Sequence, residues 1–188
     1  MNMSNRMRAA TAAIGALALA CAAALASPAY AATSGDTTTT FTLTAGSLAI
    51  TAPASANLGS VATGSASTSA QLGAITISDG RGALLGSWTG SVSSTDFTTG
   101  GATANETISK SVIDYWSGAA TASSGVGTFT PGQLLSANKV ALSASRTAFS
   151  ATVVVGNNSV TWNPTLIVNV PAAAVAGDYT GTVTHSVA

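Results

Sequence analysis

Residues 160–170 alternate between apolar and mostly polar side chains, and this pattern limits the possible fold more than any other feature of the chain. Val160, Trp162 and Leu166 stand at even positions, with threonine and asparagine residues between them. Because alternate side chains of a β-strand lie on opposite faces, the segment predicts a strand with one buried and one solvated face. Pro164 cannot donate to a ladder and predicts an edge position or a bulge.

The end of the chain has the same period. Tyr179, Val183, His185 and Val187 share one expected face, and hydroxyl residues fill the other. Threonine is favoured in strands and suits the solvated face of a sheet. Shorter segments of this kind recur along the chain, and clusters of Gly, Pro, Asn and Asp separate them. The further strands are expected at 38–44, 47–52, 72–78, 87–93, 109–116, 140–145 and 148–155.

Many short strands with regular turn signals predict an all-β fold. We expect a single antiparallel β-sandwich of the Ig-like or Greek-key type. The small residues at 62–70 predict a loop. The turns are expected at 79–82, 99–101, 131–132 and 156–158.

The first 31 residues have the composition of an export signal. Arg6 and Arg8 precede a long apolar run, and Ala29 and Ala31 are the small residues that a signal peptidase requires. An N-terminal membrane anchor is the alternative. We therefore expect a secreted protein of the cell surface, without a membrane span in the mature chain. The expected organisation is a signal peptide at 1–31, a flexible mature start at 32–37 and one domain at 38–188.

Cysteine usage limits the chemistry of the mature chain. Cys21 is the only cysteine, and it lies inside the expected signal peptide. Its surroundings loosely resemble a lipoprotein processing box, which makes a lipid anchor an alternative to simple secretion. Without lipidation, the mature chain has no thiol. Disulfides, cysteine nucleophiles and thiolate metal sites are then excluded.

Charged residues are scarce along the whole chain. It holds six basic and six acidic residues, and two of the basic ones, Arg6 and Arg8, fall in the expected signal peptide. The few remaining cations are scattered and cannot form a basic patch. Nucleic acid and acidic membrane surfaces are therefore poor partners. The surface is expected to be polar but almost uncharged.

Few residues suit catalysis or metal binding. His185 is the only histidine, and its place on the apolar face of the last strand favours a structural role over a general base. One histidine with no mature cysteine cannot build a usual zinc site, and the isolated carboxylates predict no calcium site. Asp79 and Arg81 predict a turn held by an exposed ion pair. We expect no enzyme activity, no cofactor and no metal.

Four aromatic residues are candidates for contact with a ligand. Tyr115 and Trp116 are adjacent, so on a strand one ring is expected in the core and the other on the surface. An exposed ring that stacks on a sugar is typical of glycan-binding β-sandwich proteins, and a ring that caps the core is the alternative. Trp88 and Trp162 share faces with apolar residues, which favours the core over ligand contact for both.

Two tryptophan segments, at 85–92 and 160–166, precede a final segment at 176–187. In this order they resemble the WxL-domain surface proteins of Gram-positive bacteria, especially an actinobacterial WxL-like branch. The resemblance covers most of the mature chain. It implies a secreted, non-enzymatic protein that associates non-covalently with the cell wall, by peptidoglycan binding where that has been assigned.

The family has leucine two residues after each tryptophan, where this chain has Gly90 and Pro164. Only Trp88 and Trp162 therefore carry over, as candidate wall contacts. The expected partner is a cell-wall polymer or another surface protein. The alternative function is a structural subunit that pairs its edge strands with copies of itself or with other surface proteins, as in pilus or coat assemblies.

Overall fold

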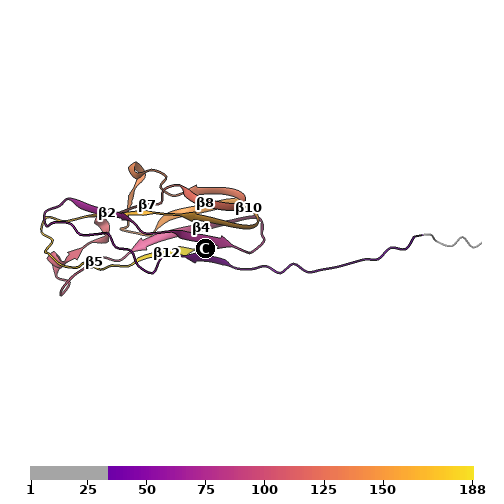
Figure 1. The fold of residues 1–188 in the computed structure, drawn as a ribbon, viewed down its shortest axis with the longest axis horizontal. Coiled ribbons are helices and arrows are strands. Elements are labelled where there is room, and N and C mark those ends of the chain that lie inside the picture. The colour runs from indigo at the N-terminus through magenta and orange to yellow at the C-terminus, as the bar shows by residue number, and fades with distance from the viewer. Residues whose placement is uncertain (1–33) are drawn as a thin grey trace, which may run out of the picture. The chain divides into compact units, whose positions relative to one another are not determined.

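The computed structural model describes residues 34–188, and their fold is all-β with antiparallel strand pairs (Figure 1). The chain divides into two units after Thr42. Residues 34–47 contain no regular secondary structure, so the strand expected at 38–44 is wrong. The strands all belong to the second unit, Leu43–Ala188. The expected signal peptide at 1–31 lies outside the described residues.

The larger sheet has six strands, in the order β1-β3-β10-β4-β12, with β8 also paired to β10. The 17-residue β10 is its centre. β8 pairs along most of β10, opposite β4 in the first half of β10 and opposite β3 in the second half. The strands are β1 (Leu48–Thr51), β3 (Ile75–Asp79), β4 (Leu84–Ser94), β8 (Ala120–Pro131), β10 (Arg146–Trp162) and β12 (Val183–Val187).

A second sheet has four strands, in the order β2-β11-β7-β9, and a two-stranded ribbon pairs β5 with β6. From β7 to β12 the chain changes sheet at every connection, so most paired strands lie far apart in sequence (Figure 1). The strands are β2 (Ser67–Gln71), β5 (Phe97–Thr98), β6 (Thr107–Ile108), β7 (Ile113–Trp116), β9 (Val140–Ala141) and β11 (Thr165–Asn169). Residues 34–188 also form three short 3-10 helices, η2 (Ala104–Glu106), η3 (Lys110–Val112) and η4 (Ser136–Asn138).

The two main sheets enclose one hydrophobic core. Ile77, Trp88 and Phe149 come from the six-stranded sheet, and Ile113 and Leu166 come from the four-stranded sheet. All five side chains are buried. The all-β expectation is thus confirmed, and the Ig-like or Greek-key form of a single sandwich stays a prediction.

The alternation at 160–170 has the expected result, because its even-numbered side chains from Val160 to Val168 are buried. The segment is not one strand, however. β10 ends at Trp162, and Pro164 lies where the chain passes into the other sheet as β11. The proline is buried, and its carbonyl accepts a hydrogen bond from the Leu72 N–H (2.9 Å). A change of sheet, not an edge or a bulge, accommodates it.

The turn expected at 156–158 is wrong, because β10 continues through it. The irregularity lies just before this segment, where β10 forms a bulge. Between Ala151 and Val155, β10 has more residues than the paired part of β4, so the register shifts. The Gly156 N–H then donates to the Ala83 carbonyl (2.8 Å), which keeps the two strands together.

Four strands, β2, β5, β6 and β8, are not predicted by the sequence. β5 and β6 are only two residues long. β2 lies partly in the loop expected at 62–70, and β8 lies in a segment with no expected strand. Small residues dominate both, and nearly every position of β8 is exposed. Apolar alternation marks only strands with one buried face, so it does not reveal these two. The strands expected at 109–116 and 140–145 are shorter than predicted, as β7 and β9.

Candidate functional site

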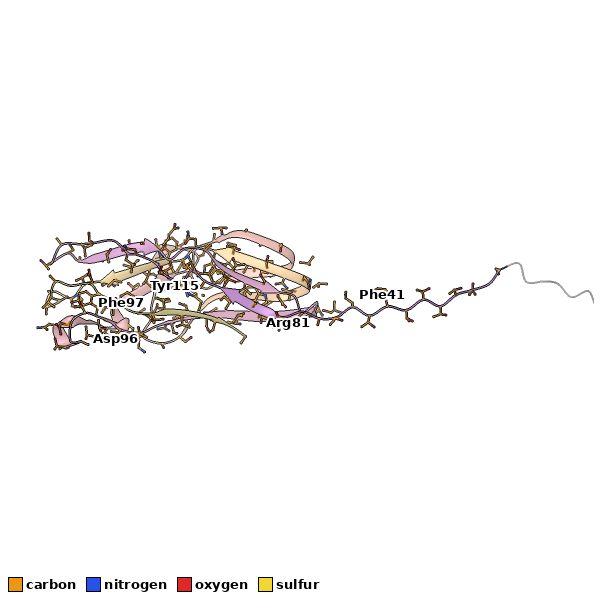
Figure 2. All side chains as sticks on the ribbon, turned by 60° about the horizontal axis from the view of Figure 1, so that its bottom comes forward. Phe41, Arg81, Asp96, Phe97 and Tyr115 are labelled. Carbon is orange, nitrogen blue, oxygen red and sulfur yellow. The ribbon has the colours of Figure 1, made fainter. Side chains whose placement is uncertain are left out.

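Three of the four aromatic candidates are part of the core. Trp88 is 2% exposed, and Trp162 and Tyr115 are fully buried. Figure 2 shows Tyr115 in the interior, between the strands of the two sheets. These three side chains therefore cannot contact a wall polymer without unfolding, which corrects their place among the candidate contacts. Trp116 faces the opposite side of β7 and is partly exposed, as the adjacent pair predicts.

The buried Trp88 indole begins a chain of hydrogen bonds. Its Nε1–H donates to Asn158 Oδ1 (3.0 Å), and Asn158 Nδ2 donates to Asp79 Oδ2 (3.3 Å). Asp79 also accepts from the guanidinium of Arg81, at 2.8 and 2.9 Å. A buried indole N–H requires an acceptor, and this network supplies it.

The sequence predicts an exposed ion pair between Asp79 and Arg81, but Asp79 is buried in the structure. Its side chain is 1% exposed, whereas that of Arg81 is 37% exposed. The hydrogen bonds from Arg81 hold the pKa of Asp79 down at about 2, against the raising effect of burial. The carboxylate is therefore ionised and fully hydrogen-bonded, so its role is to hold β3 against β10.

The second tryptophan has a matching network. Trp162 Nε1–H donates to the Tyr115 hydroxyl (3.2 Å), which lies 3.2 Å from His185 Nε2. Since the tyrosine oxygen accepts from the indole, its own proton is available for the imidazole nitrogen. Burial lowers the pKa of His185 to about 4 and raises the pKa of Tyr115. The histidine is therefore neutral at physiological pH and has the structural role that the sequence predicts.

The structure explains why leucine does not follow Trp88. A Cβ on Gly90 would lie 2.8 Å from Ile77 Cδ1 and 3.4 Å from the Phe149 carbonyl oxygen. A leucine at this position would therefore have to displace the Ile77 side chain within the core. The tryptophan motif is part of the packing of this chain.

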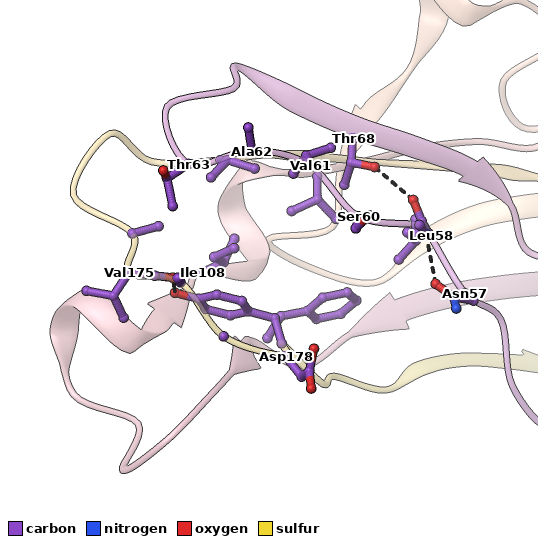
Figure 3. A pocket seen from close by; sticks show the side chains of 18 of the residues that line it. Asn57, Leu58, Ser60, Val61, Ala62, Thr63, Thr68, Ile108, Val175 and Asp178 are labelled. Atoms are coloured by element: carbon purple, nitrogen blue, oxygen red, sulfur yellow. Dashed lines mark hydrogen bonds between the residues drawn. The ribbon is translucent and has the colours of Figure 1, made fainter.

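A cleft of about 610 Å³ opens at one end of the fold (Figure 3), and no tryptophan lines it. Residues 55–63, which follow β1, form one wall, and residues 174–179 form the other. Phe97, Ile108 and Val168 supply the apolar lining. We call this cavity the end cleft.

The two walls of the end cleft are held differently. Tyr179 is fixed by its hydroxyl, which lies within hydrogen-bond distance of the carbonyls of Val175 (3.0 Å) and Asn105 (3.2 Å). In the described structure, one hydrogen bond ties residues 55–63 to a strand, from Thr68 Oγ1 to the Leu58 carbonyl (2.8 Å). The 55–63 wall is thus the more easily displaced side of the cleft.

The end cleft is lined by both apolar and neutral polar residues and is nearly uncharged. Asp178 is the one charged side chain among the lining residues, and it is exposed. Val61 and Val175 are 45% and 42% exposed and flank the opening. A smaller cavity of about 300 Å³ adjoins it and shares Phe97 and Tyr179 with it. The size and lining suit a neutral ligand with both apolar and hydroxyl faces.

Trp116 lies on the outer face of the four-stranded sheet and is not among the residues that line the end cleft. Beside it on β7, Asp114 Oδ2 accepts from Lys139 Nζ (2.6 Å) and from Asn169 Nδ2 (3.1 Å). These groups are paired with one another. Trp116 is therefore the one sequence-predicted contact residue that is free to touch a ligand.

Sequence reasoning does not find the end cleft. Its walls are loops of Ala, Ser, Gly and Val, and only the fold brings Phe97 and Tyr179, 82 positions apart, to one cavity. Within residues 34–188, no cluster of His, Cys, Asp and Glu could hold a metal ion, and no helix is long and apolar enough to cross a membrane. No protein-family model, curated protein or solved structure matches this chain.

Proposed function

We propose that this chain is an exported, non-enzymatic protein of the bacterial cell surface that binds an uncharged wall polymer non-covalently in the end cleft. The single observation that carries the proposal is the cleft itself, with a volume of about 610 Å³ and one charged lining residue, Asp178. Pockets of this size take ligands as large as a short oligosaccharide or peptide. The WxL-like order of the tryptophan segments supports a wall polymer as the ligand.

The chemistry of the lining supports a glycan or a neutral peptide. Sugars present apolar faces that stack on aromatic rings, and their hydroxyls bond neutral polar groups. Tyr179 is partly exposed and offers ring surface, whereas Phe97 is buried and contributes only to the floor of the cleft. Asn57 and Ser60 offer neutral polar groups along one wall. The lining has no basic residue to attract an anionic polymer, and Asp178 is the one group that could attract a cationic polymer.

A binding role agrees better with the titratable groups than an enzymatic one. A general base has to reach its substrate with a pKa near the working pH. His185 is hydrogen-bonded to Tyr115, and its pKa is lowered to about 4. Asp79 is enclosed by Arg81 and Asn158. Neither group is arranged to take a proton from a ligand in the cleft.

Sedimentation with isolated cell walls tests the proposal. The purified protein should appear in the wall pellet, and Val61→Asp/Val175→Asp should weaken binding about tenfold, near 1.4 kcal/mol, by placing carboxylates at the opening. The matched control is Leu134→Asp/Leu135→Asp, because these side chains are similarly exposed and lie outside the cleft. Trp116→Ala probes the outer face separately. Failure of the wild-type protein to sediment, or equal binding by both double variants, would contradict binding in the cleft.

A further inference from the structure

The edge of the six-stranded sheet formed by β8 has no partner strand in the described structure. β8 spans twelve residues, Ala120–Pro131, and pairs only with β10. Its other edge therefore presents a row of main-chain N–H and C=O groups to solvent. Every residue from Ala120 to Thr128 is exposed.

This edge lacks several of the features that normally prevent pairing between proteins, although its pairing with β10 is bulged on both sides of Val126. Edge strands are usually short, or carry charged residues, or contain proline that interrupts the ladder. No residue of β8 is charged, and its one proline, Pro131, is its last residue. A long, uncharged edge of this kind is suited to receive another strand.

An apolar row on the sheet ends at the same edge. Leu84 of β4 pairs with Val155 of β10, which pairs with Val126 of β8. The three side chains are 79%, 40% and 65% exposed. Side chains aligned across neighbouring strands stabilise one another by contact. One further strand beside β8 would extend this row and cover Val126.

The backbone beside the row is strained. Leu85 and Val153, which are not glycine, have φ angles of 58° and 55°, and both side chains are exposed. The left-handed region is costly for a β-branched residue such as valine. Val153 lies in the bulge of β10 between Ala151 and Val155, which accounts for its left-handed conformation.

Residues 37–44 have the properties of the missing strand. Their sequence is Thr-Thr-Thr-Thr-Phe41-Thr-Leu43-Thr, with no charge, glycine or proline. They are extended and belong to no sheet, and Phe41 and Leu43 are 90% and 88% exposed (Figure 2). Threonine and phenylalanine are strongly favoured in strands. In a strand, Phe41 and Leu43 would share one face.

We propose that residues 37–44 of one copy pair with the free edge of β8 in a second copy, so that Phe41 and Leu43 continue the row of Leu84, Val155 and Val126. The occupant is a second copy because each chain carries an unpaired strand-like segment and, in β8, an unpaired edge of twelve residues. The strands at the other ends of the sheets, β1, β2, β9 and β12, span at most five residues. Both surfaces are uncharged, so no repulsion opposes the contact.

The two surfaces of this contact are different, so it is heterologous. One copy donates residues 37–44 and receives the segment of the next copy at β8. Repetition of such a contact gives a ring if it closes and a filament if it does not. The contact is independent of polymer binding, because no residue of the end cleft belongs to β8 or to residues 37–44.

Complementation between two variants tests the pairing. Phe41→Asp/Leu43→Asp disables the donated segment, and Val126→Lys/Thr128→Lys places charges at the receiving edge, all at exposed positions. Sedimentation velocity should show wild-type assembly that grows with protein concentration, and monomers for each variant alone. A mixture of the two variants should form one-to-one dimers and nothing larger, since one intact segment meets one intact edge.

Site-specific crosslinking places the contact. Leu43→Cys and Val126→Cys proteins, both in a Cys21→Ser background, should form a disulfide-linked dimer when mixed and mildly oxidised. Leu43→Cys with Leu135→Cys is the matched control, because Leu135 is 59% exposed and lies outside β8. Pairing raises the local thiol concentration, so the first mixture should give roughly tenfold more dimer than the control.

Three results would overturn the proposal. The first is a wild-type protein that stays monomeric at high concentration. The second is assembly by the wild type with no dimer in the mixture of variants, which would place the contact on another surface. The third is equal crosslinking of Leu43→Cys with Val126→Cys and with Leu135→Cys. Unchanged urea midpoints of the variants exclude unfolding as the cause.

Discussion

Trp88 and Asn158 are joined by a buried hydrogen bond of 3.0 Å, from the indole Nε1–H to the amide Oδ1, although 70 residues separate them in sequence. Through Asn158 the indole is connected to Asp79, whose side chain is 1% exposed. The first tryptophan of the motif is thus fixed by a polar group of β10 as well as by packing. Because these hydrogen bonds connect β4, β10 and β3, loss of the Trp88 contact should weaken the larger sheet.

Asn158→Leu should lower the free energy of unfolding by about 1–3 kcal/mol, because it leaves the Trp88 N–H buried without an acceptor. Urea denaturation followed by tryptophan fluorescence measures the change. Ser91→Ala is the control, since it removes an exposed hydrogen bond to Ser186 and should change stability by less than about 0.5 kcal/mol. Equal effects of the two substitutions would contradict a role for the buried network.

His185 should titrate near pH 4, well below its ordinary value of 6.5, because burial disfavours the imidazolium. It is the only histidine in the chain, so its ring resonances can be followed in NMR spectra without assignment. The unfolded state binds the proton first as the pH falls. Stability should therefore decline between pH 6.5 and pH 4, by up to roughly 3 kcal/mol.

His185→Phe should remove the decline in the free energy of unfolding between pH 6.5 and pH 4. Below pH 4, the pH dependence of stability should be the same in the variant and the wild type. A midpoint near 6.5 in the NMR titration of the wild-type protein would show that the ring is solvated, against the buried contact with Tyr115.

Asp79 should make the stability of the fold depend on pH in a second, more acidic range. Its pKa in the fold is about 2, below the ordinary value of 3.8, chiefly because of hydrogen bonds from Arg81. The stability it contributes is present above about pH 4 and is lost as the pH falls toward 2, by about 2 kcal/mol. Urea midpoints measured from pH 5 to pH 2 should show this loss for the wild type and a flatter profile for Asp79→Asn. Parallel profiles would rule out Asp79 as the source.

Gly90→Leu restores the leucine of the resembled motif and should destabilise the fold by about 1–3 kcal/mol or more, because its side chain meets Ile77 and the backbone of Phe149. Gly90→Ala tests the same contact more gently. Ile77→Val removes the Cδ1 atom nearest to the new Cβ, so the double variant Gly90→Ala/Ile77→Val should be more stable than additivity predicts. Strict additivity in thermal or urea unfolding would show that the two sites are not in contact.

The sequence predicts those parts of the fold that have one buried face. The alternation around Trp162 and the last strand with Val183 and His185 correspond to β10, β11 and β12. The opposite orientation of Tyr115 and Trp116 also follows from period two. In each case a local rule is sufficient, because burial on one face leaves a mark in the residues themselves.

Other elements depend on partners that lie far away in sequence. β8 is exposed along most of its length and is held by main-chain pairing with β10 and by Phe129, which packs against the core near Trp88. Its small residues therefore give no alternating signal. The segment 38–44 has strand propensity but no partner within the described chain, so the propensity is not realised. The end cleft arises only where Phe97 and Tyr179 meet, and neither residue is distinctive in its local sequence.

The pairing of distant strands around β10 has a consequence for the order in which the protein can fold. β5 and β6 are the one pair of sequence neighbours that bond to each other in the described structure. β3, β4 and β8 each pair with β10 (Arg146–Trp162), and these pairings cannot form until that late segment of the chain is present. Folding through such non-local contacts is slow, on the order of milliseconds to seconds. A chain of this design cannot complete its larger sheet until the residues of β10 are present, so a fragment that ends before Arg146 lacks the central strand of that sheet.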